Sequence, residues 1–239
     1  MVKTPKPQPP VGPARVRRGY FECRFGQLHL HNSMPPGGGF EEGTALLCIQ
    51  GATGTGRVFA PFMALACRDR SGYAPDLPGL GESDPTGASP TVAEYAAALG
   101  DFIDTMRLRR LDVLSCRSGA FIAAELALAR PEQIGRVVMV SVPVPQQGPR
   151  SEPAAAASLS EGERRLLEAL RQFPARERLS RLSQRLLVLR PKDDLWEATG
   201  RIREVLPAAR VLDLDLTGEA LFASAPERLY EAVGDFLRG

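Results

Sequence analysis

The segment Leu114–Ala120 reads Leu-Ser-Cys-Arg-Ser-Gly-Ala, and its Cys116, Arg117 and Ser118 side chains could do chemistry. It closes an apolar run and opens an alanine-rich stretch, so it lies where a strand turns into a helix. Cys116 and Ser118 are of nucleophile type, whereas Arg117 would present a fixed positive charge. The segment is therefore the first candidate for a functional site.

A nucleophile of this kind needs a base, and histidine is the usual one near neutral pH. The chain holds only two histidines, His29 and His31, and none follows residue 31. Both belong to one expected strand and lie on the same face of it, because side chains alternate along a strand. A serine activated by a histidine late in the chain is therefore excluded.

The composition narrows the kind of partner. Thirty Lys and Arg residues stand against 28 Asp and Glu residues, and the arginines are scattered rather than clustered with aromatic residues. We therefore expect neither a nucleic acid nor a membrane as partner, but a small-molecule substrate, and a homodimer is compatible with the sequence. The four cysteines show no CxxC pair and no histidines at metal-ligand spacing, so no metal site or disulfide framework is expected.

The order of elements predicts the fold class. An expected hairpin over 16–34 precedes strands at 45–49, 72–75, 111–115, 137–142, 186–189 and 211–216. Helices are expected at about 58–67, 91–106, 119–129, 195–206 and 226–237 between and after these strands. Strands that alternate with helices indicate a doubly wound, mostly parallel α/β sheet, in which ligands bind at the carboxyl ends of the strands.

Two segments depart from this alternation. Residues 1–15 are rich in proline and basic residues, without the apolar core of a signal peptide, so we expect a disordered tail on a cytoplasmic domain spanning 16–239. Residues 143–183 are first rich in Pro, Ala and Ser and then begin a helix with a capping box, Ser160 and Glu163. This insertion is either a lid or a plain surface connection.

Several segments together resemble the α/β-hydrolase superfamily over nearly the whole chain, from about residue 20 to 238. They are LLCIQGATGTG, APDLPGLGESDP, DVLSCRSGAFIAAELALARPEQIGRVVMVSVP, LLVLRPKDDLWEAT and LTGEALF followed by APERLYEAVGDFL. Within the second of these, Asp76 is expected to be a structural turn residue. The resemblance implies a nucleophile on a tight turn called the elbow, a histidine base, an orienting carboxylate and backbone N–H donors for an oxyanion.

The elbow can be aligned in two ways. Matching Gly119 and Ala120 to the small residues that follow the family's nucleophile places Arg117 at the tip, and the spacing to the helix end at Ala129-Arg130-Pro131-Glu132 agrees. A shift by one residue places Ser118 at the tip, between Cys116 and Ala120. In the first alignment, which we favour, Cys116 points away from the pocket as a small buried hydrophobe.

The resemblance also assigns the remaining positions. Glu219 stands where the family carries its histidine, and Asp193 or Asp194 stands at the orienting carboxylate, with Asp193 expected in the pocket and Asp194 at the start of the next helix. The oxyanion donors would be the amides of Ala52 and Ser118. Gln50, ahead of Gly51, replaces the family's usual histidine and would brace the pocket or bind a ligand.

The expected function follows from these replacements. Arg117 would hold a carboxylate, enolate or phenolate, with Glu219 as acid or base and Asp193 nearby. We therefore expect a cofactor-independent, non-hydrolytic biosynthetic enzyme, either a cyclase, a lyase or a decarboxylase, for a small carbonyl-bearing, polyketide-like metabolite of secondary metabolism. The alternatives are a catalytically silent ligand-binding protein and an atypical hydrolase that uses Ser118 or Cys116, with Asp194 in place of Asp193 as the alternative carboxylate.

Overall fold

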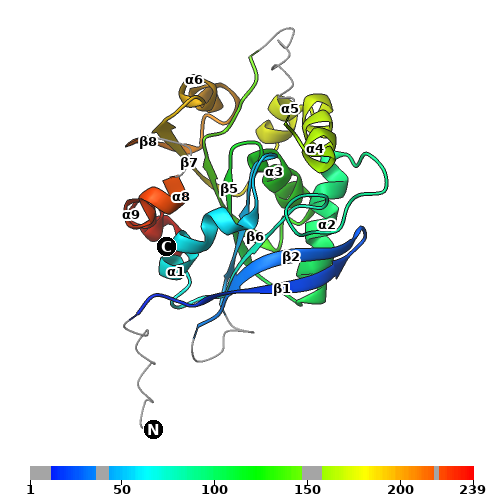
Figure 1. Cartoon of the computed structure of the whole chain (residues 1–239). Helices are drawn as coiled ribbons and strands as arrows, with labels where there is room; N and C mark the ends of the chain where they lie inside the picture. Colours follow the sequence, from blue (N-terminus) through cyan, green and yellow to red (C-terminus); the bar gives the residue numbers. More distant parts are fainter. Residues whose placement is uncertain (1–11, 36–42, 147–157, 218–220) are drawn as a thin grey trace, which may run out of the picture.

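The computed structural model describes residues 12–35, 43–146, 158–217 and 221–239, and its centre is one eight-stranded sheet. The strand order is β1-β2-β4-β3-β5-β6-β7-β8. The pair β1 and β2 lies at one end of the sheet and the pair β7 and β8 at the other (Figure 1). The strands are β1 (Val16–Cys23), β2 (Gly26–Ser33), β3 (Ala45–Ile49), β4 (Gly72–Pro75), β5 (Leu111–Cys116), β6 (Ile134–Val140), β7 (Arg185–Lys192) and β8 (Arg210–Thr217). Only β2 runs antiparallel to its neighbours, β1 and β4, so the expected mostly parallel α/β sheet with an N-terminal hairpin is confirmed.

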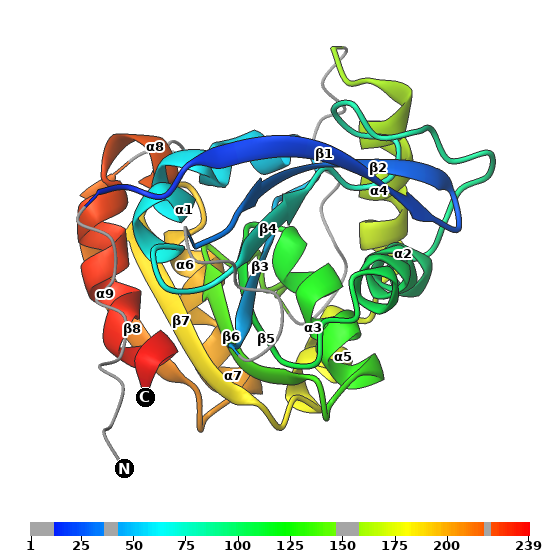
Figure 2. The ribbon, with the colours of Figure 1, turned by 90° about the horizontal axis from the view of Figure 1, so that it is seen from below.

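Helices cover both faces of this sheet (Figure 2). One face carries α1 (Ala60–Ala66), α8 (Leu221–Ser224) and α9 (Pro226–Arg238), and the other carries α2 (Val92–Thr105), α3 (Gly119–Ala129) and α5 (Ala175–Ser180). Residues of β3 alternate between the two cores, because Leu47 and Ile49 pack with α2 and α3 while Leu46 and Cys48 pack with α1 and α9. This double burial explains why the central strands are continuous apolar runs.

Two expected helices differ in detail from the structure. The helix expected near 58–67 begins as a 3₁₀ turn, η1 (Gly56–Phe59), and continues as α1. The helix expected near 195–206 is divided into α6 (Trp196–Gly200) and α7 (Ile202–Val205). None of the helices in the described ranges combines the length and the apolarity that a bilayer span requires.

The insertion after β6 supplies α4 (Glu161–Gln172) and α5. The Ser160 hydroxyl accepts from the Glu163 amide, and the Glu163 carboxylate accepts from the Ser160 amide, which confirms the expected capping box. Arg165 on α4 donates to the Thr86 carbonyl, which ties the helix to the loop after β4. Residues 147–157 lie outside the described residues, and the lid role stays a prediction.

The chain ahead of β1 touches the domain. Ala14 is buried, and its amide donates to the Ala64 carbonyl on α1 at 2.7 Å. The expected tail over 1–15 therefore includes one residue that packs in the structure, whereas residues 1–11 lie outside the described part.

The start of α3 lies against the end of β3, and this contact generates a prediction. A Cβ added to Gly119 would clash with the carbonyl groups of Ile49 and Gln50, which are backbone atoms that cannot rotate away. We expect Gly119→Ala to lower the free energy of unfolding by about 1–3 kcal/mol, the usual cost of overpacking. Urea unfolding followed by the fluorescence of Trp196, the single tryptophan, measures it.

Gly135→Ala is the matched control, because its added Cβ would lie 3.6 Å from the nearest atom, at Asp112. Ordinary contact of this kind predicts unchanged or slightly higher stability. A wild-type unfolding midpoint for Gly119→Ala would show that α3 does not approach β3 as closely as described.

Candidate active site at the strand-to-helix elbow

The turn between β5 and α3 holds Arg117 in an unusual backbone conformation. Its φ is +52°, in the left-handed region that residues other than glycine seldom occupy. The Arg117 amide donates to the Val140 carbonyl of β6 at 2.8 Å, and its carbonyl accepts from the Ala120 amide. Ser118, by contrast, has helical angles and directly precedes α3. Arg117 therefore occupies the sharp turn of this elbow.

The loop after β3 packs against the elbow through a second glycine. A Cβ on Gly51 would lie 3.2 Å from the Arg117 Cβ and 3.4 Å from the Ser118 Oγ, tighter than most real contacts. The small residues at 51 and 119 thus allow the two loops to approach closely and hold Arg117 in its strained conformation.

The Arg117 guanidinium forms a bidentate pair with Asp194, which follows β7. Its Nη1 and Nη2 donate to the two carboxylate oxygens at 2.9 and 2.8 Å. These hydrogen bonds keep the pKa of Asp194 below its usual range. The side chains are 32% and 55% exposed, so water screens the pair and its net contribution to stability is small.

Asp193 has a different partner. The Ser141 Oγ, at the carboxyl end of β6, donates to its Oδ2 at 2.5 Å, and the Leu195 amide donates to its Oδ1 at 2.9 Å. The expectation that Asp194 caps the following helix is wrong, because α6 has no side-chain cap and Asp194 pairs with Arg117 instead. Asp193 lines the pocket described below, where the sequence analysis expected it.

The two expected oxyanion donors belong to residues in direct contact. The Ala52 amide donates to the Ser118 Oγ at 3.0 Å, so the hydroxyl occupies the acceptor position that an oxyanion would take at this donor. Gln50 is 1% exposed. The nitrogen of its side-chain amide donates to the Pro75 carbonyl at 2.8 Å, and the oxygen of that side chain accepts from the Leu77 backbone amide at 3.0 Å. Gln50 therefore braces the loop after β3 against the loop after β4.

Cys116 lies at the last position of β5, just before the turn. It is 9% exposed, and burial raises the pKa of its thiol to about 11. A thiol with this pKa is almost entirely protonated near neutral pH, and the protonated form is a poor nucleophile. Cys116 belongs to the buried apolar cluster that includes residues of α1 and α9, as expected of a small buried hydrophobe, and it is also among the residues that line the pocket.

A small pocket of about 190 Å³ brings these residues together. It is lined by Gln50, Gly51, Thr53, Gly54, Val58, Cys116, Arg117, Val140, Ser141, Asp193, Leu221 and Phe222. Sequence reasoning missed Ser141, the lining residue that donates to Asp193, although its place directly after the buried run 137–140 could have marked it. Glu219 lies outside the described residues, and neither histidine lines this pocket.

The match to known proteins agrees with this architecture. The sequence model of the alpha/beta hydrolase fold family matches residues 44–211. The chain belongs to this family. The fold of this α/β-hydrolase is similar to that of an enol-lactonase from Burkholderia xenovorans LB400, with a TM-score of 0.79 at 16% identity over 92% of the chain and 100% of the other. Cfl2 from Burkholderia cenocepacia gives a TM-score of 0.74 at 17% identity, over 93% and 96% of the two chains.

A curated relative matches a smaller part of this α/β-hydrolase. An uncharacterized protein of Mycobacterium tuberculosis is 28% identical over 99 residues, which is 41% of the chain and 29% of that protein's length. The chain therefore matches less than a third of this relative. These solved structures support the fold of the α/β-hydrolase, and its chemistry must be inferred from its own site.

The Arg117–Asp194 pair predicts a pH dependence. Because the pKa of Asp194 is depressed in the folded protein, the pair stabilises the fold above the ordinary carboxyl pKa of about 3.9 and loses this effect as the pH falls through the depressed value. A ¹³C NMR titration should place the midpoint of Asp194 below the ordinary value, and Arg117→Gln should return it to that range. Asp101, held by Arg24, is the internal control whose midpoint should not move in the variant.

Cys116 yields a second prediction. With a pKa near 11, its thiolate fraction at pH 7.5 is about two orders of magnitude below that of an ordinary thiol, so iodoacetamide should alkylate it at least about a hundredfold more slowly than in the unfolded protein. Peptide mapping after timed alkylation, with urea-unfolded protein as the control, measures this ratio. Equal rates in the two states would show that the Cys116 thiol is neither buried nor raised in pKa.

Proposed function

We propose that this α/β-hydrolase is a non-hydrolytic enzyme in which Arg117 stabilises a negatively charged oxygen of a small, carbonyl-bearing substrate. The observation that carries the proposal is the guanidinium at the sharp turn between β5 and α3, beside a pocket of about 190 Å³. A guanidinium cannot be deprotonated at physiological pH. It can therefore stabilise negative charge as a permanent cation and hydrogen-bond donor, but it can act neither as a nucleophile nor as a base.

Conventional ester hydrolysis requires a nucleophile and an imidazole base. The elbow carries Arg117 in place of the nucleophile, and no histidine follows residue 31 in the chain. Ser118, the serine that follows Arg117 in the chain, accepts a hydrogen bond from the Ala52 amide through its hydroxyl. Without a nucleophile and a base, the backbone donors to an oxyanion would supply only a small part of the rate acceleration of a full triad. Hydrolysis is therefore not the reaction that this site favours.

The pair between Arg117 and Asp194 supports a role in anion binding. Because both side chains are partly exposed, exchanging the Asp194 carboxylate for the oxygens of a ligand costs little. The planar guanidinium matches a carboxylate or enolate in the same bidentate geometry that Asp194 uses. Once the ligand excludes water, the interaction becomes stronger than the pair it replaces.

We assign the reaction to the class of cyclisations, eliminations or decarboxylations that pass through an enolate or phenolate. When a proton leaves the carbon next to a carbonyl, or carbon dioxide leaves it, the electron pair moves onto the carbonyl oxygen, where Arg117 stabilises it. Asp193 or Glu219 would exchange the proton. A polyketide-like metabolite of secondary metabolism has the required carbonyl groups, and this chemistry needs no cofactor.

A second candidate function is ligand binding without turnover. It is favoured by the internal pairing of the site, since Ser118 satisfies the Ala52 amide and Asp194 satisfies the guanidinium. Calorimetric binding of a compound that stays chemically unchanged would distinguish this function from catalysis. A cytoplasmic location and a homodimer remain predictions from the sequence.

The probe 4-nitrophenol tests the anion site without knowledge of the substrate, because its phenolate absorbs visible light. We expect the bound phenol to ionise about one pH unit below the free phenol, which corresponds to about tenfold tighter binding of the anion. Arg117→Gln should abolish this shift. Arg24→Gln is the control, because Arg24 forms a similar bidentate pair with Asp101 outside the pocket.

Two results would contradict the proposal. One is the absence of any shift that depends on Arg117. The other is strong labelling by a fluorophosphonate that disappears in Ser118→Ala, which would identify Ser118 as a nucleophile and the protein as an atypical hydrolase.

A further inference from the structure

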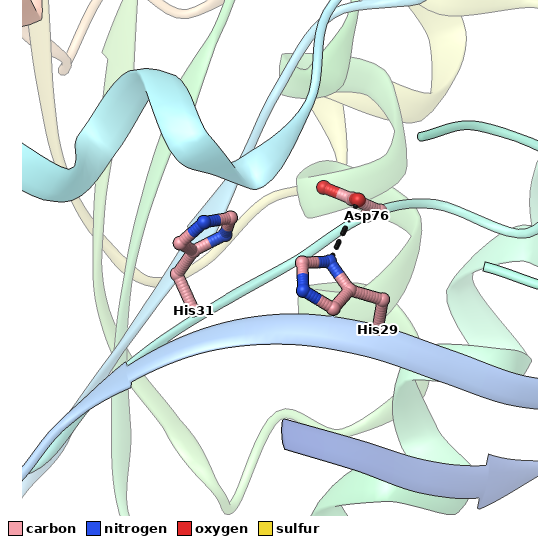
Figure 3. Close-up of side chains that lie close together, drawn as sticks. All are labelled: His29, His31 and Asp76. Atoms are coloured by element: carbon pink, nitrogen blue, oxygen red, sulfur yellow. Dashed lines mark hydrogen bonds and ion pairs between the residues drawn. The ribbon is translucent and has the colours of Figure 1, made fainter. Parts of the chain in front are cut away.

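Two histidines and an aspartate meet on the antiparallel side of the sheet, away from the elbow pocket. His29 and His31 project from the same face of β2, and Asp76 directly follows β4, which pairs with β2 (Figure 3). The Asp76 amide donates to the His29 carbonyl at 2.8 Å, which fixes the relative position of the two chains. The three side chains are thus held by neighbouring backbone segments.

The three side chains are almost completely buried. His29 and Asp76 are each 2% exposed, and His31 is 9% exposed. Each offers one possible ligand atom, and these atoms lie within 4.8 Å of one another. The two imidazole rings are 5.0 Å apart between centroids and nearly perpendicular. Nitrogen and oxygen donors at this separation can converge on one ion with small shifts of the side chains.

Two of the ring nitrogens have no partner. The His29 Nε2 and the His31 Nδ1 are buried and make no hydrogen bond within the part of the chain that the structure describes. An unsatisfied buried polar atom costs about 1–3 kcal/mol, so such atoms usually mark an ion, a water or a functional group. Two of them in adjacent rings point to a ligand that lies between these rings.

Hydrogen bonds fix the Asp76 carboxylate next to the two histidines. Its Oδ2 lies 2.9 Å from the His29 Nδ1, and its oxygens also accept from the Gly56 amide at 2.6 Å and the Glu82 amide at 3.1 Å. A carboxylate that holds one ring nitrogen of a histidine leaves the other available, as in many metal sites.

We propose that His29 and His31 bind one divalent transition-metal ion of the Zn²⁺ class through the His29 Nε2 and the His31 Nδ1, while Asp76 holds the His29 ring from its Nδ1 side. Imidazole nitrogens are donors that such ions prefer, and water would complete the coordination. The ion would join β2, the loop after β4 and, through the Asp76 contact with Gly56, the start of η1. The sequence analysis expected no metal site because Asp76 is far from both histidines along the chain.

Zn²⁺ alone is the probe, with a preparation that carries no histidine tag. Calorimetry should give one ion per chain, and the melting temperature should rise with Zn²⁺ and return with a chelator. His29→Gln and His31→Gln should each weaken Zn²⁺ binding at least about a hundredfold, because each removes one of the two imidazole ligands. Asp215→Asn, a carboxylate on the exposed surface, is the control and should bind Zn²⁺ as the wild type does.

A measurement on the unaltered protein keeps the proposal testable if the variants fold poorly. The chain has only two histidines, so NMR reports both imidazole rings without ambiguity, and both should shift on addition of Zn²⁺. Unchanged histidine signals, no binding at millimolar Zn²⁺, or binding that survives in both variants would each overturn the proposal. The last result would place the ion elsewhere, for instance on the cysteines.

Discussion

The close approach of two backbone turns is the constraint on which the rest of the site depends. Gly119 at the start of α3 leaves no room for a side chain, Gly51 in the loop after β3 lies tightly against Arg117, and Arg117 has a φ of +52°. A larger residue at either glycine would separate the turns and release the strained conformation. Because strain of this kind costs about 1–3 kcal/mol, it persists only where the surrounding structure enforces it.

The charges around the elbow are arranged differently from those in the core. Arg117 and Asp194 are partly exposed, so water screens their ion pair. Asp112 in β5 is fully buried between Arg70 and Arg136, and burial raises the pKa of its carboxyl. A buried carboxylate that loses its partners is costly, so Asp112 serves the fold. The pair at the elbow is partly exposed, and it borders the pocket that Arg117 lines.

The two candidate sites occupy different parts of one sheet. The elbow pocket lies at the carboxyl ends of the parallel strands β3, β5, β6 and β7, where open α/β sheets bind ligands. The cluster of His29, His31 and Asp76 lies where antiparallel β2 joins β4. An ion there would join β2 to the loop after β4, whereas neither histidine lines the elbow pocket.

The sequence by itself determined the order of the strands and the helices, because buried parallel strands must be apolar and helix starts need caps such as Ser160. It also determined what the elbow lacks, since no histidine follows residue 31. Only the tertiary structure decided which aspartate pairs with Arg117, that Ser141 joins Asp193, and that Asp76 reaches the two histidines. These contacts join residues on different strands, and pairing between strands depends on the packing of the whole sheet, which local sequence patterns do not record.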